Sequence, residues 1–411
     1  MKDTKMYEQL LGLESPWRVR DVDLRLEQGE VVIHVEEDRQ RWACPECRMR
    51  MHVHDYAVRR WRHLETCQFK TIVEAKVPRV KCAEHGTTTV QVPWADKHSR
   101  FTALFERLAI DMMHDCSISA ASKYLRLSWD ETDHIKAKAV ERGLRRKGVV
   151  ATHAICIDEK SVGRGHDYVT VVTKITDSGP LVDFIGDGRE QRVLDAFWTA
   201  HDEDALEQIH CVSMDMWKPY IHSVEQHLPA GKAAISHDPF HLIKNMNEAV
   251  DQVRRQEVAL LTREDAEPLK GTRYLWLYGF ENLPSKWGKR IKEFKESQMK
   301  TARAWRLKET LRGMYQCQTW AQAEAFFKDW NRDAMRSKLE PVKKVARMIK
   351  DHLVQVLNFF VHRVTNAYSE GFNSTIQALI KRANGYRSRD RLKRDLYFHL
   401  GGLDLYPQTV Q

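Results

Sequence analysis

Residues 154–160 read Ala-Ile-Cys-Ile-Asp-Glu-Lys, a short apolar strand that ends in carboxylates. Two further strand patterns follow at 168–175 and 181–185, and glycines separate them. The three segments are therefore expected to form an antiparallel meander. Because side chains alternate along a strand, Asp158 and Glu159 should lie on opposite faces.

The chain then alternates between helical and strand patterns. A helix at 192–208 is followed by the strand Ile-His-Cys-Val-Ser-Met-Asp, which ends at Asp215. A second helix precedes another strand that ends at Asp238, and a helix at 239–261 closes the segment. The order of three strands, helix, strand, helix, strand, helix is that of a ribonuclease H-like domain. In that topology the first and fourth strands are neighbours, so Asp158 and Asp215 should lie side by side.

A third acidic position is Glu370, in a helix predicted at 366–382. Its apolar stripe contains Phe372, Ile376 and Leu379, and Glu370 lies on the polar side. The neighbouring Gly371 costs a helix about 1 kcal/mol relative to alanine, which indicates a close approach at that point.

Three clustered carboxylates suit two Mg²⁺ or Mn²⁺ ions, because these hard cations prefer oxygen ligands. Such a pair of ions activates an attacking oxygen and stabilises the leaving oxygen of a phosphodiester. Each acid taken alone could equally cap a helix or face solvent. Asp238 is a rival for the second aspartate. Strand order favours Asp215, and it leaves Asp238 and His241 to support the site.

A zinc site is predicted near the N-terminus. Cys44-Pro-Glu-Cys47 and Cys82-Ala-Glu-His85 each deliver two ligands from a tight turn, and tetrahedral zinc needs four. The residues at 69–77 between them alternate as a strand, so a zinc ribbon is expected. The alternative is ordinary buried cysteines with a surface histidine. Three intervening histidines could replace a ligand, namely His52, His54 and His63.

The next segment has the pattern of a helix-turn-helix. Helices are expected at 101–113, 117–125 and 129–144, with Ser128 and Glu131 forming a capping box at the start of the third. This third helix would read the major groove. Four basic side chains on it are candidate DNA contacts: His134, Lys136, Lys138 and Arg142. The alternative is a plain three-helix bundle with a solvated basic face.

Bulk properties agree with a multidomain nucleic-acid-binding protein. The chain has 411 residues, 42% hydrophobic residues and a formal net charge of +9, which favours a polyanionic partner. No apolar run approaches the ~20 residues that span a bilayer, so a cytoplasmic protein without a membrane partner is expected. The expected segments are a strand region and zinc ribbon (1–97), a helix-turn-helix domain (98–148), the first part of the core (149–262), a helical insertion (263–340) and the last part of the core with a basic tail (341–411).

Two basic segments lie in the second half of the chain. Residues 286–312 hold ten Lys or Arg against three Glu, together with Trp287, Phe294 and Trp305. This composition fits contact with phosphates and unstacked bases, or equally a solvated helix whose aromatic residues are in a core. The second segment follows Glu370, and we expect it to contact phosphate through Lys381, Arg382, Arg387 and Arg389.

Several motifs together resemble the DDE transposases of bacterial insertion sequences, in particular the ISL3 family. They are CPEC and CAEH, IDEKSVGRGHDYVTVV, SMDMWKPY, HDPFHLIKNMNEAVDQVRR and AYSEGFNSTIQALIKRANGYRSRDRLKRDLYFHL, and with the helix-turn-helix they span most of the chain. The resemblance implies that Asp158, Asp215 and Glu370 are the metal ligands. It also implies that the zinc and helical segments bind terminal inverted repeats. The pair Cys82–His85 departs from the expected CxxC.

The resemblance implies a DNA-cutting and DNA-joining enzyme with two Mg²⁺ or Mn²⁺ ions per active site and a structural Zn²⁺. Its partners would be double-stranded DNA, both the repeats and a target, and its place the bacterial nucleoid. Joining two ends normally requires at least a homodimer. Two alternatives are a non-catalytic DNA-binding repressor derived from a transposase, and a ribonuclease H-like nuclease that acts on branched DNA.

Overall fold

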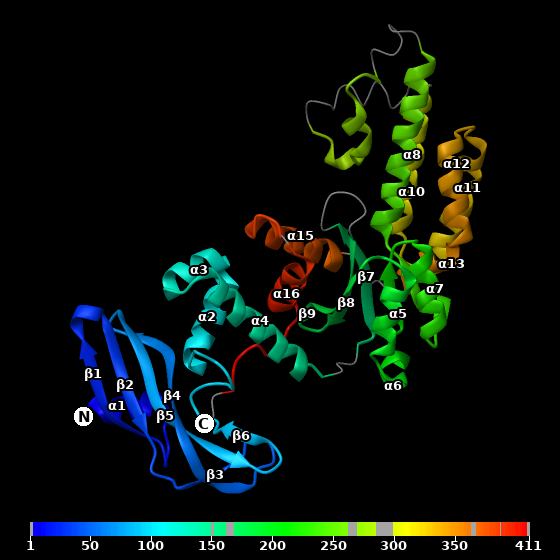
Figure 1. Ribbon diagram of the computed structural model, residues 1–411. Helices are drawn as coiled ribbons and strands as arrows, with labels where there is room; N and C mark the ends of the chain where they lie inside the picture. Colours follow the sequence, from blue (N-terminus) through cyan, green and yellow to red (C-terminus); the bar gives the residue numbers. More distant parts are fainter. Residues whose placement is uncertain are drawn as a thin grey trace. The chain divides into compact units, whose positions relative to one another are not determined.

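The computed structural model describes residues 3–148, 152–161, 168–261, 269–284, 299–362, 367–386 and 388–408. The chain forms two compact units (Figure 1). Unit 1 comprises Met1–Gly148 and Asp390–Gln411, and unit 2 comprises Val149–Arg389. Of the helices in the described ranges, none is long and apolar enough to cross a bilayer.

Unit 1 begins with helix α1 (Asp3–Leu10) and a sheet in the order β1-β2-β5-β4-β3, with β6 paired to β5. The predicted alternation at 69–77 is confirmed, since Thr71, Val73, Ala75 and Val77 are all buried. One face of the sheet packs around Trp17, Trp61 and Trp94. The strands are β1 (Arg18–Arg25), β2 (Glu30–Glu36), β3 (Arg41–Ala43), β4 (Arg50–Thr66), β5 (Phe69–Cys82) and β6 (Gly86–Thr89), and the short helix η1 (Leu26–Gln28) joins β1 to β2.

The three predicted helices of the helix-turn-helix segment are present as α2 (Ala103–Asp115), α3 (Ile118–Leu125) and α4 (Trp129–Arg146). The capping box at the start of α4 is confirmed: the Ser128 side chain accepts from the Glu131 amide, and the Glu131 side chain accepts from the Ser128 amide. Arg126 has φ of 52°, the left-handed conformation that ends α3 and makes the tight turn.

Helix α16 (Arg389–Leu400) and the tail behind it complete this domain. Phe398 and Leu405 are buried in one cluster with Phe105 and Ile135 of the three helices. The structure differs here from the expectation that 341–411 belongs to the core as a whole, because residues 390–411 pack with unit 1. Apolar side chains at 398 and 405 bury their surface against the helix-turn-helix, which provides the driving force.

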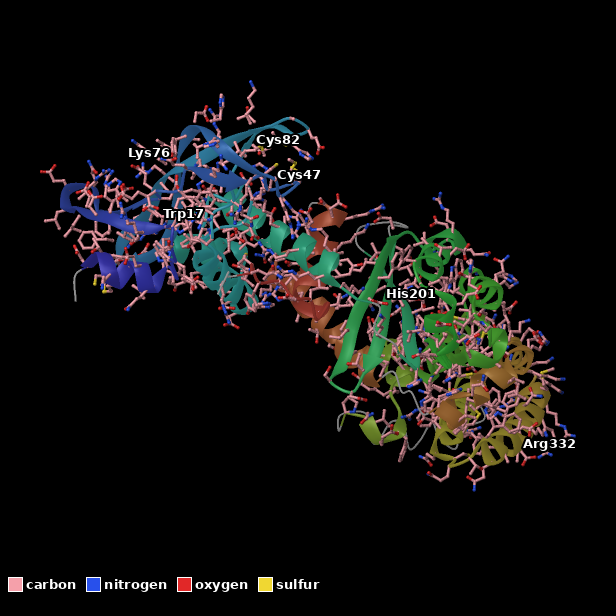
Figure 2. All side chains as sticks on the ribbon, turned by 90° about the horizontal axis from the view of Figure 1, so that it is seen from below. Trp17, Cys47, Lys76, Cys82, His201 and Arg332 are labelled. Carbon is pink, nitrogen blue, oxygen red and sulfur yellow. The ribbon has the colours of Figure 1, made fainter. Side chains whose placement is uncertain are left out.

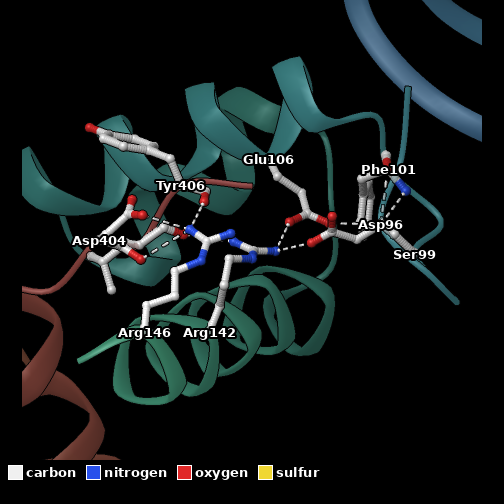
Figure 3. Close-up of polar contacts among 9 residues, drawn as sticks. Asp96, Ser99, Phe101, Glu106, Arg142, Arg146, Asp404 and Tyr406 are labelled. Carbon is white, nitrogen blue, oxygen red and sulfur yellow. Dashed lines mark hydrogen bonds and ion pairs between the residues drawn. The ribbon is translucent and has the colours of Figure 1, made fainter. Parts of the chain in front are cut away.

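Two predicted DNA contacts are thereby corrected. Lys136 is 3% exposed and forms an ion pair with Asp395, so it is not available to phosphate. Arg142 is 6% exposed, and its guanidinium donates to Glu106 at 2.7 Å, to Asp96 at 2.8 Å and to the Leu405 carbonyl at 2.6 Å (Figure 3). Both cations hold unit 1 together.

Unit 2 contains a sheet in the order β11-β10-β7-β8-β9. Strands β7 to β9 form the predicted antiparallel meander, and β10 pairs in parallel with both β7 and β11. The first and fourth strands of the unit are therefore neighbours, as the ribonuclease H-like order predicts. The bounds are β7 (Ala154–Ser161), β8 (Tyr168–Thr176), β9 (Gly179–Asp187), β10 (Cys211–Met214) and β11 (Ile235–His237).

Helices α5 and α7 lie on one side of this sheet, and α15 lies on the other, where it contacts β9 (Figure 1). The single helix predicted at 192–208 is wrong, because Asp202 caps a new helix and divides the segment into α5 and α6. The helices are α5 (Gln191–Thr199), α6 (Glu203–Glu207), α7 (Lys218–His227), η2 (Gly231–Ala234), α8 (Pro239–Leu260) and α15 (Ala367–Arg382).

The predicted helical insertion packs on α8 around buried aromatic residues. Trp305 is 2% exposed and belongs to this core, so it cannot stack on a base; Trp287 and Phe294 lie outside the described residues. Lys308 is buried and donates to the carbonyls of Trp276 and Tyr278, and desolvation lowers its pKa to about 8. The elements are η4 (Arg273–Leu277), η5 (Phe280–Asn282), α10 (Lys300–Gly313), η7 (Met314–Gln316), α11 (Trp320–Arg336), α12 (Glu340–Asp351), α13 (Leu353–Leu357) and α14 (Phe359–His362).

The buried pair Lys136–Asp395 generates a stability prediction. The substitution Asp395→Leu leaves a buried ammonium without its carboxylate, and it should lower the free energy of unfolding of unit 1 by about 3–5 kcal/mol. Urea unfolding of the full chain measures this loss. The double variant Lys136→Met with Asp395→Leu should recover most of it.

Asp404→Asn is the matched control, since its ion pair with Arg146 leaves the carboxylate 62% exposed. This variant should cost less than about 1 kcal/mol. Equal losses of unfolding free energy in the Asp395 and Asp404 variants would contradict the prediction that burial decides how much each ion pair matters for stability.

Candidate functional site

The four predicted zinc ligands lie in two hairpin turns of unit 1. Cys44 and Cys47 lie in the turn between β3 and β4, and Cys82 and His85 lie in the turn between β5 and β6. The ligand atoms of all four residues are within 4.8 Å of one another. Figure 2 shows the Cys47 and Cys82 side chains at neighbouring positions on these turns.

The geometry and chemistry of these side chains fit zinc. Tetrahedral Zn–S bonds of about 2.3 Å put two sulfurs about 3.8 Å apart. The Cys47 and Cys82 sulfurs are 3.6 Å apart, and the Cys82 sulfur is 3.5 Å from His85 Nδ1. The Cys47 amide lowers the pKa of the Cys44 thiol, and the His85 amide lowers that of Cys82. Lower thiol pKa values favour the thiolate that binds the metal.

The rival histidines do not join this cluster. His63 is buried beside Thr102, at 2.9 Å between Nδ1 and Oγ1, and desolvation lowers its pKa to about 4. His52 Nε2 accepts a hydrogen bond from Arg41. Among the described residues, the four predicted ligands form the group of His, Cys, Asp or Glu side chains whose ligand atoms lie close enough together to hold one metal ion. His85 is therefore a suitable fourth ligand despite the departure from CxxC.

The zinc site predicts that the purified chain holds one equivalent of Zn²⁺. Cys47→Ser should lose the metal and unfold the ribbon, because a unit this small draws its folding free energy from the metal. Metal analysis together with circular dichroism measures both effects. Cys67 is exposed and stands apart from the cluster, so Cys67→Ser should keep full zinc content. Zinc retained by the Cys47 variant would contradict the ligand set.

The two predicted catalytic aspartates follow paired strand positions in unit 2. Strands β7 and β10 are parallel, and Ile157 pairs with Met214. Asp158 and Asp215 are the next residues along each strand direction, so they lie at neighbouring positions on the same edge of the sheet. Their side chains are 25% and 44% exposed. Solvent and a cation can therefore reach both carboxylates.

Each aspartate has a cationic or ionisable neighbour. Asp158 Oδ2 is 2.9 Å from Lys160 Nζ, and its Oδ1 accepts from the Glu159 amide. Asp215 Oδ1 accepts from the Met216 amide at 2.6 Å, and its Oδ2 is 3.4 Å from His241 Nδ1. The backbone amides thus fix one oxygen of each carboxylate, and Lys160 and His241 face the other.

Asp238, the rival second aspartate, is built differently. It follows β11, which is separated from β7 by β10. Its side chain is 2% exposed and caps α8 by accepting from the Phe240 amide at 2.9 Å. His241 Nε2 lies 3.6 Å from Asp238 Oδ2 while its Nδ1 faces Asp215. This arrangement favours Asp215 as the ligand, with Asp238 and His241 behind it.

The third predicted acid, Glu370, lies in α15, but its side chain is outside the described part of the structure. The helix has the predicted apolar stripe, with Phe372, Ile376 and Leu379 buried. The convergence of Glu370 with the two aspartates thus stays a prediction.

The remaining candidate DNA contacts differ in exposure. His134 is exposed and Lys138 is half-buried on α4. Lys381 and Arg382 are exposed at the end of α15, and Arg387 lies outside the described residues. Arg389 is 47% exposed and 3.9 Å from Asp187. His134 and the cations at the end of α15 stay accessible to a phosphate backbone.

Sequence reasoning missed a cluster beside the aspartates. The Arg189 guanidinium lies over the rings of Tyr168 and Trp217, and Arg189 Nη1 is 3.4 Å from Glu159 Oε2. The only signal in the sequence was that Glu159 and Trp217 closely follow the two aspartates.

Comparisons with known proteins agree along the chain. Residues 40–85 match the zinc finger of the transposases IS204/IS1001/IS1096/IS1165, residues 90–132 match the helix-turn-helix domain of transposase family ISL3, and residues 155–396 match the ISL3 transposase model. The transposase for insertion sequence element IS1001 of Bordetella parapertussis is 25% identical over 397 residues, which cover 95% of this chain and 96% of that protein. The transposase for insertion sequence element IS1557 of Mycobacterium tuberculosis is 27% identical over 423 residues, which cover 95% and 94%.

Proposed function

The chain belongs to the ISL3 family of transposases, and from this premise we propose that it binds the terminal inverted repeats of its insertion sequence and catalyses metal-dependent cleavage and transfer of DNA strands. The observation that carries the proposal is the parallel pairing of β7 with β10, which ends at Ile157 and Met214, so that Asp158 and Asp215 are the next residue on each side. Two partly exposed carboxylates at these neighbouring positions suit a hard divalent cation.

Asp158, Asp215 and Glu370 would hold two Mg²⁺ or Mn²⁺ ions in this proposal. When bound, such ions activate the attacking oxygen and stabilise the leaving oxygen of a phosphodiester. The protein residues hold and orient the site. His241 pairs with Asp238 on one side and orients Asp215 on the other. The backbone amides of Glu159 and Met216 each fix one oxygen of the carboxylate before them in the chain. No covalent link between protein and DNA is needed, because water and then a DNA 3′-hydroxyl would be the nucleophiles.

Recognition of the ends is assigned to unit 1, with its zinc ribbon and helix-turn-helix. Basic groups would contact phosphate, namely the exposed His134 and the half-buried Lys138 from α4, joined by the exposed Lys381 and Arg382 from α15 of unit 2. The net charge of +9 favours association with a polyanion, and end binding should weaken as salt rises. Because two ends must be joined, we propose that at least two copies assemble on DNA.

Cleavage of repeat-end DNA in Mg²⁺ tests the proposal. Asp158→Asn, Asp215→Asn and Glu370→Gln should each reduce strand cleavage by more than about a hundredfold, the upper end of the loss for groups that only support metal ligands. End binding in a gel-shift assay should persist, because the ends are recognised elsewhere. Asp204→Asn, a change at an exposed acid of α6, is the control and should retain full activity.

Asp238→Asn separates the two candidate second aspartates. Asparagine also caps helices, so the Asp238→Asn variant should retain most of the cleavage activity. If Asp238→Asn abolished cleavage while Asp215→Asn remained active, the ligand role would pass to Asp238. Absence of any Mg²⁺-dependent nicking by the wild-type chain would favour the DNA-binding repressor. Preference for a four-way junction over a repeat-end duplex in competition would favour the branched-DNA nuclease.

A further inference from the structure

Arg189 lies in the short connection between β9 and α5, and it touches residues that follow both aspartates. On one side, its Nη1 is 3.4 Å from Glu159 Oε2, and Glu159 is the residue after Asp158. On the other side, its guanidinium carbon lies 4.6 Å from the ring centre of Trp217, two residues after Asp215. A single side chain thus connects the end of β7 with the segment that follows β10.

The backbone around Arg189 is fixed as well. The Trp217 indole donates to the Arg189 carbonyl at 2.9 Å, so the tryptophan holds both the main chain and the guanidinium. Gly188 donates to the Tyr168 carbonyl at 2.9 Å and accepts from the Thr170 hydroxyl at 2.7 Å. Gly188 has φ of +97°, a backbone conformation that residues with a side chain rarely adopt, and this lets the chain turn directly before Arg189.

Two aromatic rings restrict the guanidinium. The ring centre of Tyr168, at the start of β8, lies 4.5 Å from the guanidinium carbon, in addition to the contact with Trp217. A planar guanidinium stacks on aromatic rings and donates to a carboxylate through a rigid fork of N–H groups, whereas a lysine ammonium is a compact point charge without that fork. The Arg189 side chain is 31% exposed, so it is more than two-thirds covered by these neighbours.

We propose that Arg189 is a positioning residue that fixes the ends of β7 and β10 relative to each other, and with them the separation of the Asp158 and Asp215 carboxylates. Because two ligands on separate strands must meet one ion, a loosened strand end lowers metal affinity even though no ligand is lost. Trp217 and Glu159 are the groups through which Arg189 acts. This inference rests on the proposed metal site of the preceding section.

Direct metal binding tests the role without relying on activity. Mn²⁺ is titrated into the full-length, zinc-loaded chain, and free Mn²⁺ is followed by electron paramagnetic resonance. Arg189→Ala should weaken Mn²⁺ binding about tenfold, the lower end of the range for groups that support metal ligands. The Mn²⁺ affinity of Arg189→Lys should lie between those of the wild type and of Arg189→Ala. In cleavage assays, excess Mg²⁺ should rescue Arg189→Ala but not Asp158→Asn.

Arg192→Ala is the matched control, because Arg192 is an exposed arginine three residues further along the same segment. It should bind Mn²⁺ as the wild type does. If thermal unfolding measurements show that Arg189→Ala does not fold, Glu159→Gln replaces it as the test variant. That change keeps the shape of the side chain and removes only the ion pair, so it should weaken binding about threefold.

The possible outcomes are distinct. Unchanged Mn²⁺ affinity in folded Arg189→Ala, with wild-type binding that Asp158→Asn removes, overturns the role of Arg189 and leaves the proposed function standing. Weaker binding of DNA ends with normal Mn²⁺ affinity makes Arg189 a DNA contact and also overturns the inference. If the wild-type chain binds no more Mn²⁺ than Asp158→Asn does, both the role of Arg189 and the proposed function are overturned.

Discussion

The parallel pairing of β7 with β10 is the constraint on which the candidate active site depends. Ile155 and Val212 are fully buried in register on the two strands, and this hydrophobic surface fixes their alignment. A slip of one residue would turn every side chain of a strand to the other face. The same alignment that buries the core therefore also decides where Asp158 and Asp215 emerge. Folding energy and site geometry are coupled through a single register.

In unit 1 the corresponding constraint is a set of buried ion pairs. Lys136 and Arg142 point into the domain, where Asp395 and the Leu405 carbonyl meet them. Residues 390–411 are thereby part of unit 1 with the helix-turn-helix, although the match to the ISL3 transposase model extends to residue 396. Only residues 383–388 separate α15, which carries Glu370, from α16.

Local signals in the sequence predicted local structure well. The capping box of Ser128 and Glu131 and the two metal-binding turns depend on residues close in sequence, and the individual strands of unit 2 depend on hydrophobic periodicity. The order of those strands follows instead from the ribonuclease H-like pattern of elements. The burial of Lys136 could not be predicted, because its partner lies 259 residues further along the chain. A basic residue on a helix is by default assigned to solvent or to DNA. The side chain of Glu370 stays a prediction from the family resemblance.

Carboxylates in this chain fall into two electrostatic classes, and the difference bears on function. Those that are buried are compensated by protein donors: Glu106 by Arg142, Asp183 by Lys174, and Asp238 by the start of α8. Burying a charge without such partners is costly. Asp158 and Asp215 are instead partly in solvent, so each can exchange water for a cation without breaking the core. A strand pair that carries incompletely buried acids therefore needs no metal to keep its core intact, and both carboxylates stay accessible to the proposed cation.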